Sequence, residues 1–248
     1  MKISELLRIC GVKPDDTAVV RCALGAQNAD LQALLEELTA FFAPGVLVMP
    51  TGGDAATAVP GGIFDPLNTP SGEGELSELF RTLPGVVRSC HPANSLAALG
   101  EANEWLMAGH EKCPSAFSAA SPWWKICQQG GTMILIGCGL ESAGIIAAAE
   151  EWAGIAKLSK RFYHRRLALG NGRNRRIKIK LHTGSHALNY PKAEELLRSE
   201  GLLSRSNWDR CDVIVMDMNG CVDFLLRHLR RKPRYFAARR RSVNLKKM

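Results

Sequence analysis

Apolar residues recur along the first part of the chain with alternating helical and strand periods. Residues 3–12 (ISELLRICGV) have apolar positions at helical spacing, and residues 15–24 (DDTAVVRCAL) predict a short buried strand. Residues 30–42 (DLQALLEELTAFF) predict a helix capped by Asp30, and residues 45–51 (GVLVMPT) predict a second strand. This alternation predicts an α/β fold with a largely parallel central sheet flanked by helices.

The middle of the chain continues the same alternation. Residues 95–110 (SLAALGEANEWLMAGH) predict an amphipathic helix, and residues 121–131 (SPWWKICQQGG) predict another that Ser121 caps. Residues 132–139 (TMILIGCG) form the clearest buried strand, and a helix over 142–155 (SAGIIAAAEEWAGI) is expected to follow it.

The last part of the chain adds a different element before a final strand and helix over 211–229. Residues 162–182 (FYHRRLALGNGRNRRIKIKLH) predict an added β-hairpin turned at Asn171-Gly172. The period of two divides its second strand into an apolar face of Ile177, Ile179 and Leu181 and a polar face of Lys178, Lys180 and His182.

The chain has 248 residues and is 46% hydrophobic, which suits one large core. We expect a single domain over residues 1–236 and a solvated basic tail over 237–248. Glu5 interrupts the N-terminal apolar segment and Glu141 the longest apolar run, so we expect a cytoplasmic protein without a signal peptide or membrane span. Eight cysteines are spread singly without zinc spacing, which predicts reduced thiols and no metal.

The net charge of +8 hides a strong asymmetry. Residues 1–150 carry 8 Lys and Arg against 16 Asp and Glu, whereas residues 151–248 carry 24 against 8. The first part is therefore acidic and the second strongly basic. Such a division indicates that one part meets a cationic partner and the other meets phosphates, a membrane or nucleic acid.

A polar stretch between the apolar segments is the main candidate for chemistry. Residues 52–74 are rich in Gly, Pro, Asp and Ser and are too long for an ordinary connection, and long loops after strand ends are often functional. Residues 64–92 (FDPLNTPSGEGELSELFRTLPGVVRSCHP) then end in a turn that combines Arg88, Ser89 and His91.

Four motifs follow one another along the chain: GV-x-P-x-D near the start, VLVMPT, FDP with TPS, and G-x-L-x-E-x-F-R-x-x-PG-V-V-R-S-x-HP-x-x-S. In this order they resemble the aminoglycoside 3-N-acetyltransferase family, and the resemblance extends over roughly residues 1–236. It implies an α/β fold unrelated to the GNAT acetyltransferases. It also implies acetyl-CoA or another acyl-CoA as donor, an amine-bearing small molecule as acceptor, and no metal.

The resemblance also implies roles for particular residues. Arg88 and Ser89 are expected to hold the pantetheine amides or a phosphate of the donor, since a guanidinium and exposed donors suit such acceptors. His91, held beside Pro92, is the expected base for attack of the amine on the thioester. Further donor contacts are expected at Cys22, Ala23, Leu24 and Thr51, and acceptor contacts at Asp65, His110 and Glu150. For Asp65 an Asx-turn is an equally good interpretation.

The chain departs from the family at two places. The family's H-x-x-E motif is matched by Ala147 and Glu150, so its His is missing. The family's HSSL is matched by Arg21, Cys22, Ala23 and Leu24.

Three outcomes fit these departures. The first is an acyltransferase with a changed acceptor that uses His91 or Glu150 as base. The second uses Cys22 as a nucleophile, because the neighbouring cation of Arg21 would lower the pKa of its thiol. The third is a catalytically divergent protein that binds nucleic acid or tRNA through its basic part. The sequence leaves the oligomeric state open.

Overall fold

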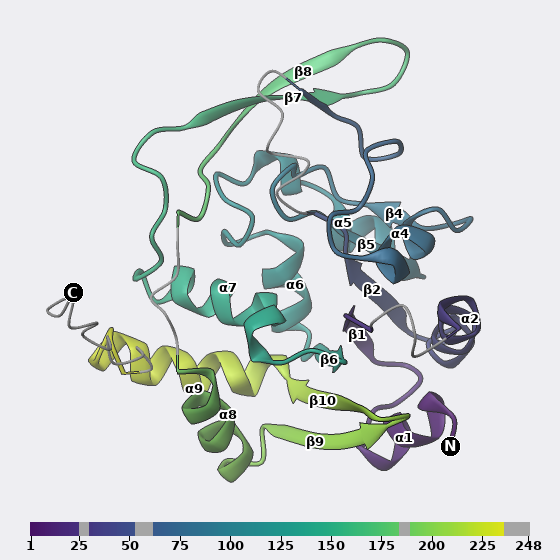
Figure 1. The fold of residues 1–248 in the computed structure, drawn as a ribbon. Coiled ribbons are helices and arrows are strands. Elements are labelled where there is room, and N and C mark those ends of the chain that lie inside the picture. The colour runs from purple at the N-terminus through teal and green to yellow at the C-terminus, as the bar shows by residue number, and fades with distance from the viewer. Residues whose placement is uncertain (25–29, 53–61, 184–188, 236–248) are drawn as a thin grey trace, which may run out of the picture.

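The computed structural model describes residues 1–24, 30–52, 62–183 and 189–235 (Figure 1). The helices are α1 (Ile3–Ile9), α2 (Leu31–Phe41), α4 (Glu75–Arg81), α5 (Asn103–Met107), α6 (Pro122–Gln128), α7 (Gly144–Trp152), α8 (Tyr190–Ser199) and α9 (Met218–Arg231). The strands are β1 (Thr17–Cys22), β2 (Val46–Pro50), β3 (Ile63–Phe64), β4 (Val87–Arg88), β5 (Leu96–Gly100), β6 (Thr132–Ile136), β7 (Tyr163–Ala168), β8 (Asn174–Ile179), β9 (Leu203–Trp208) and β10 (Cys211–Asp217).

The main sheet has the strand order β4-β5-β2-β1-β6-β10-β9. Its centre is parallel, because β1 pairs in parallel with both β2 and β6. The strands on either side, β5 and β4 at one edge and β10 and β9 at the other, run antiparallel to their neighbours. The expected α/β fold with helices around a central sheet is confirmed, and the carboxyl ends of the three parallel strands meet at one edge of the sheet.

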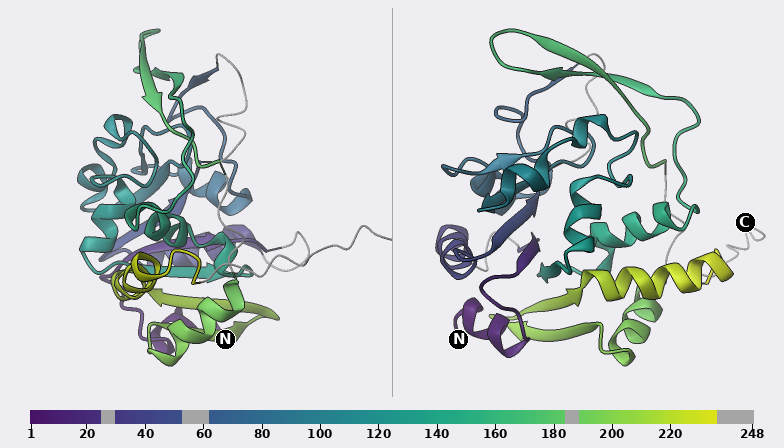
Figure 2. Two further views of the ribbon diagram at one scale, coloured as in Figure 1. Left: turned by 90° about the vertical axis from the view of Figure 1, so that its left-hand side faces the viewer. Right: turned by 180° about the vertical axis from the view of Figure 1, so that it is seen from behind.

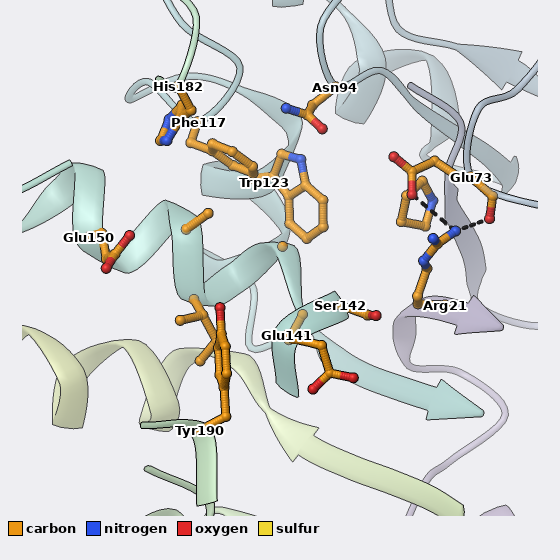
Figure 3. Close-up of a pocket in the computed structure, with 15 residues that line it drawn as sticks. Arg21, Glu73, Asn94, Phe117, Trp123, Glu141, Ser142, Glu150, His182 and Tyr190 are labelled. Carbon is orange, nitrogen blue, oxygen red and sulfur yellow. Dashed lines mark hydrogen bonds and ion pairs between the residues drawn. The ribbon is translucent and has the colours of Figure 1, made fainter. Parts of the chain in front are cut away.

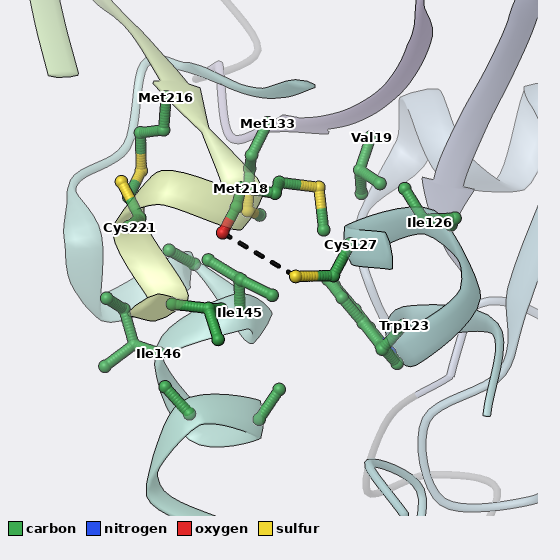
Figure 4. Close-up of a cluster of buried hydrophobic side chains, with 14 of the residues drawn as sticks. Val19, Trp123, Ile126, Cys127, Met133, Ile145, Ile146, Met216, Met218 and Cys221 are labelled. Carbon is green, nitrogen blue, oxygen red and sulfur yellow. Dashed lines mark hydrogen bonds between the residues drawn. The ribbon is translucent and has the colours of Figure 1, made fainter. Parts of the chain in front are cut away.

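Two apolar cores, one on each face of the main sheet, produce three layers. Val19, on one face of β1, lies in one core with Trp123 and Ile126 of α6 (Figure 4). Residues of α5, α7, α8 and α9 belong to the same core. Val20, on the opposite face, packs with residues of α1, α2 and α4. Alternate strand residues therefore enter opposite cores, as the period of two requires.

A small second sheet stands above the main body (Figure 2). Strands β7 and β8 pair antiparallel over six residue pairs, and β3 joins β7 in parallel. The turn has positive φ at Gly170, Asn171 and Gly172, a conformation that glycine and asparagine adopt most readily. Leu167, Ile177 and Ile179 face Phe64 in a core of their own.

One element differs from the expected pattern. Residues 95–110 do not form one amphipathic helix; β5 runs over Leu96–Gly100, and the short α5 follows over Asn103–Met107. Leu96, Ala97 and Ala98 are fully buried between the two helical layers and pair with β2. Sheet pairing therefore overrides the local preference of Leu and Ala for helix.

Other expectations concern the whole chain. Residues 53–61 of the long loop and the expected tail over 237–248 lie outside the described residues, and a single domain over 1–236 stays a prediction. None of the helices that the structure describes is long and apolar enough to cross a bilayer. Within the described ranges, no group of three or more His, Cys, Asp and Glu side chains could hold a metal ion.

Gly100 should be far less tolerant of substitution than Gly109, although both have positive φ. A Cβ on Gly100 would lie 2.3 Å from the carbonyl oxygen of Gly45, whereas one on Gly109 would meet nothing within 4 Å. Gly109→Ala should cost about 1–2 kcal/mol for its φ alone. Gly100→Ala should cost a further ~1–3 kcal/mol for the clash. Urea unfolding of both variants checks this, and equal losses would contradict it.

Candidate active site

A cavity of about 450 Å³ opens where the parallel strands end (Figure 3). Arg21 of β1 and Pro50 of β2 form one side, and residues 141–144, which follow β6, form another. In α/β sheets, ligands bind outside the carboxyl ends of the strands. The remaining lining comprises Glu73, Asn94, Phe117, Trp123, Ile146, Ala147, Glu150, His182 and Tyr190.

The lining of this cavity is acidic. It contains the carboxylates of Glu73, Glu141 and Glu150, and Arg21 is its one Lys or Arg among the described residues. The Arg21 guanidinium lies 3.0 Å from the Glu73 carboxylate and also donates to the Glu73 carbonyl oxygen. The cavity therefore favours a cationic ligand over an anionic one.

Glu150 is held in the cavity wall by α7. Its side chain is 2% exposed, and its Oε1 makes no hydrogen bond to the described residues. Burial raises the pKa of this carboxyl above its ordinary value, and the nearby His182 and Lys157 oppose that shift. Gly144 lets α7 approach α6, since a Cβ there would lie 2.5 Å from the Trp123 ring. A buried carboxyl with an unused oxygen is a site for a hydrogen-bond donor or a cation.

His182 and Glu151 form a pair that the sequence did not predict. His182 Nε2 lies 2.8 Å from Glu151 Oε2, across 31 positions of the chain. The ring of Phe117 meets the imidazole edge to face, with centroids 5.1 Å apart. His182 was expected only on the polar face of the hairpin, and no local pattern links it to Glu151.

Arg88 lies outside the cavity lining and is bonded within the protein. Its Nη2 donates to the Thr51 carbonyl at 2.6 Å, its Nη1 donates to the Thr69 carbonyl, and its Nε donates to Ser95 Oγ at 3.0 Å. Burial lowers the pKa of Arg88 to about 10, so it remains charged at neutral pH. The guanidinium that was expected to hold the acyl donor therefore hydrogen-bonds to the backbone carbonyls of Thr51 and Thr69 and connects the two segments that contain them.

Ser89, His91 and His110 are also buried outside the cavity lining. Ser89 Oγ lies 2.8 Å from His110 Nδ1, and His110 Nε2 lies 2.9 Å from the Ala116 carbonyl, to which it donates. His91 stacks on His110, and burial lowers the pKa of His91 to about 4. A fully buried imidazole with so low a pKa is a poor base at neutral pH, so the geometry does not favour His91 in that role.

The remaining expected donor contacts divide into buried and exposed groups. Thr51 is fully buried, and its Oγ1 lies 3.2 Å from the Ser95 carbonyl. Burial raises the pKa of the Cys22 thiol to about 11, which disfavours the nucleophilic thiolate. Ala23 is exposed just beyond β1 and Leu24 is half-buried, so both can meet a ligand.

Asp65 forms the Asx-turn that was the alternative interpretation of its role. Its Oδ1 accepts from the backbone of Leu67 at 2.9 Å, and its Oδ2 accepts from the Asn68 amide at 2.8 Å. The Asn68 bond is the main cause of a lowered pKa for this carboxyl. Among the expected catalytic and acceptor residues, Glu150 alone lines the cavity in the part of the chain that the structure describes.

Comparisons with known proteins agree with this architecture. A family model described as aminoglycoside 3-N-acetyltransferase matches residues 18–230. Aminoglycoside N(3)-acetyltransferase VII of Streptomyces paromomycinus is 39% identical over 80 residues, which cover 32% of this chain and 27% of that protein. Aminoglycoside N(3)-acetyltransferase VIII of Streptomyces fradiae is 34% identical over 89 residues, covering 35% and 31%. The matched segments thus span under a third of these curated relatives.

Solved structures of similar fold cover almost the whole chain. The apoenzyme of aminoglycoside acetyltransferase AAC(3)-IVa superposes with a TM-score of 0.79 at 23% identity, covering 96% of this chain and 90% of that one. The binary complex of AAC-IIIb with CoASH superposes with a TM-score of 0.74 at 19% identity, covering 96% and 97%. At these identities the likeness establishes a shared fold.

Acidification should destabilise the protein through its buried histidines. Burial holds His91 and His110 neutral when folded, with the pKa of His110 also well below its ordinary value. The pKa of each histidine is lower in the folded protein than in the unfolded chain, where it is near 6.5. The free energy of unfolding is therefore highest above pH 6.5 and falls as the pH falls toward the pKa values of the folded protein. With its folded pKa at about 4, His91 should contribute a loss of about 2 kcal/mol between pH 7 and pH 5, and His110 should add to this loss.

Urea unfolding at several pH values checks this prediction. His91→Gln removes one of the two titrating groups and should reduce the slope of stability against pH in this window. At pH 8, where both histidines are neutral in either state, the difference in unfolding free energy between wild type and His91→Gln measures the packing loss alone. A slope in His91→Gln equal to that of the wild type would contradict the prediction that His91 is protonated on unfolding.

Proposed function

The chain belongs to the aminoglycoside 3-N-acetyltransferase family, and we propose that it transfers an acetyl or related acyl group from a coenzyme A thioester to an amine. The observation that carries this proposal is the acidic cavity at the carboxyl ends of the parallel strands, with the unbonded carboxyl oxygen of Glu150 in its wall. A protonated amine would bind there and be oriented by that carboxyl.

The acceptor is proposed to be a small molecule with several amines. Phe117, Trp123 and Tyr190 add aromatic surface to the acidic lining, which suits the apolar faces of sugar rings or a polyamine chain. The basic residues of the second part of the chain contribute no Lys or Arg to the described lining. The charge asymmetry therefore does not oppose a cationic acceptor, whether an aminoglycoside or another amine.

The donor is proposed to be acetyl-CoA or another acyl-CoA. The presence of CoASH in the AAC-IIIb complex, a protein of the same fold, supports this choice. Ala23 and Leu24 remain the proposed donor contacts, because they lie at the end of β1 and are not fully buried. Direct attack of the amine on the thioester is preferred over a Cys22 intermediate, since the buried thiol stays protonated at neutral pH.

A thioester-consumption assay with acetyl-CoA tests this proposal, using gentamicin, sisomicin, apramycin and spermidine as acceptors. Glu150→Gln should raise KM for a cationic acceptor and lower kcat/KM at least about 10-fold, because it removes a carboxylate from the cavity. Glu195→Gln, at an exposed position on α8 away from the cavity lining, is the matched control and should retain activity. Absence of thioester consumption with every amine would overturn the proposal.

A second role is suggested by the hairpin. On its outer face, His164 lies opposite Lys178 and Arg166 lies opposite Arg176, and all four are exposed. Arg166, Arg176 and Lys178 thus present positive charge on one exposed face, which suits the phosphates of a polyanion. We propose that this face also binds a polyanion, with RNA or DNA as the partner.

Gel retardation of tRNA and duplex DNA at increasing salt tests this second role. Arg176→Gln with Lys178→Gln should weaken binding and reduce the slope of log affinity against log salt by about 1 to 2, because two phosphate contacts are lost. Arg227→Gln with Arg230→Gln, two exposed positions on α9, removes the same charge elsewhere. If both double variants weaken binding equally, or if the wild type does not retard nucleic acid at low salt, the hairpin is not the binding site.

A further inference from the structure

We propose that His182 is the catalytic base of this chain and that Glu151 positions it. This inference rests on the proposed acyl transfer to an amine. The proposed proton acceptor follows strand β8 of the hairpin. No residue of the R-S-x-H-P motif takes part in the proton transfer.

The contacts of His182 leave one ring nitrogen available. Because a carboxylate only accepts, the 2.8 Å contact with Glu151 Oε2 requires the proton on Nε2. Nδ1 then carries the lone pair, and it makes no hydrogen bond to any residue that the structure describes. The side chain is 22% exposed and lines the cavity, so an acceptor amine can reach it.

Glu151 is itself fixed from behind. Its Oε1 accepts from Ser115 Oγ and, at 3.5 Å, from Ser118 Oγ, which leaves Oε2 for the imidazole. Trp152 Nε1 donates to the Phe117 carbonyl at 2.5 Å and ties the same loop to α7. The Phe117 ring meets the imidazole edge to face, so both the tautomer and the ring plane of His182 are set by neighbours.

No other imidazole lines the cavity in the described ranges. His91 and His110 are fully buried, and His110 uses both ring nitrogens within the protein. His164 is exposed on the hairpin, and His228 is bonded to a carbonyl of its own helix α9. Ala147, which lines the cavity one turn before Glu150, carries no group that could accept a proton.

The two neighbouring carboxylates then have separate tasks. Glu150, whose pKa is raised by burial, lines the same cavity as His182 and holds the amine that His182 deprotonates. Nδ1 of His182 first takes a proton from the bound ammonium and passes it to water, which leaves a neutral amine with a lone pair. As that nitrogen attacks the thioester carbonyl, a second N–H bond breaks and Nδ1 takes this proton. The C–N bond forms, the C–S bond breaks, and the departing thiolate takes the proton from the imidazolium to give free coenzyme A.

The test compares variants in the thioester-consumption assay with the best amine of the panel. His182→Gln keeps a donor for Glu151 and should lower kcat by about 10²–10⁴-fold with little change in KM for acetyl-CoA. His182→Ala should lose the same activity and regain part of it when imidazole is added to the buffer. Glu151→Gln should lower kcat at least about 10-fold without rescue by imidazole, since the ring is present but misoriented. Glu195→Gln, at an exposed position on α8 outside the cavity lining, is the control and should keep full activity.

The outcomes separate this inference from the proposed function. If the wild type consumes thioester and His182→Gln keeps its full kcat, the base assignment is wrong and the acyltransferase stands. A loss in His182→Ala that imidazole does not restore, in a variant with wild-type melting temperature, would make His182 a binding residue and overturn its role as base. A wild type that is inactive with every amine overturns the proposed function and this assignment together.

Discussion

The buried guanidinium of Arg88 joins the segments on which the cavity depends. It donates to the carbonyl of Thr51 at the end of β2, to Ser95 beside β5, and to the loop carbonyl of Thr69. Loop carbonyls removed from water need donors, and one guanidinium supplies several in a fixed plane. The desolvation cost of the charge is offset by these bonds and by the ring of Phe64, whose centroid lies 5.1 Å from the guanidinium carbon.

The contacts of Arg88 help to position two sides of the cavity. The loop that Arg88 fastens continues to Glu73, which pairs with Arg21 at the cavity. Phe64 lies in β3, which pairs with β7 and so connects the hairpin to the body, and His182 comes soon after that hairpin. Residues that carry no cavity contact themselves thus determine where the cavity residues lie.

Most of the fold could be predicted from the sequence because its elements have strong local patterns. The alternating apolar runs around Val19 and Ile134 and the capped helices at Asp30 and Ser121 agree with the structure. The strand at Leu96–Gly100 could not be predicted, because its identity is set by pairing with β2 and not by its own composition.

The site was harder to predict because its chemistry depends on contacts between distant segments. Glu150 could be anticipated from a motif on one helix, whereas the contact of His182 with Glu151 joins positions 31 residues apart. The densest motif, around Ser89 and His91, suggested chemistry from its residue types. Ser89 Oγ instead contacts His110 and accepts from the Leu96 backbone, whereas His91 is fully buried outside the cavity lining and its Nε2 makes no hydrogen bond to a described residue.

Adjacent carboxylates on α7 show why residue type alone does not assign a role. Both oxygens of Glu151 have partners, two serine hydroxyls on one side and an imidazole on the other. Glu150, one residue earlier, is buried with an oxygen that no described residue satisfies, and burial raises the pKa of its carboxyl. A helix turns about 100° per residue, so neighbours in sequence enter different surroundings. Glu151 thereby supports an imidazole, whereas Glu150 offers an unbonded oxygen to a cation. The surroundings of each carboxyl determine this difference, and it cannot be read from the residue type.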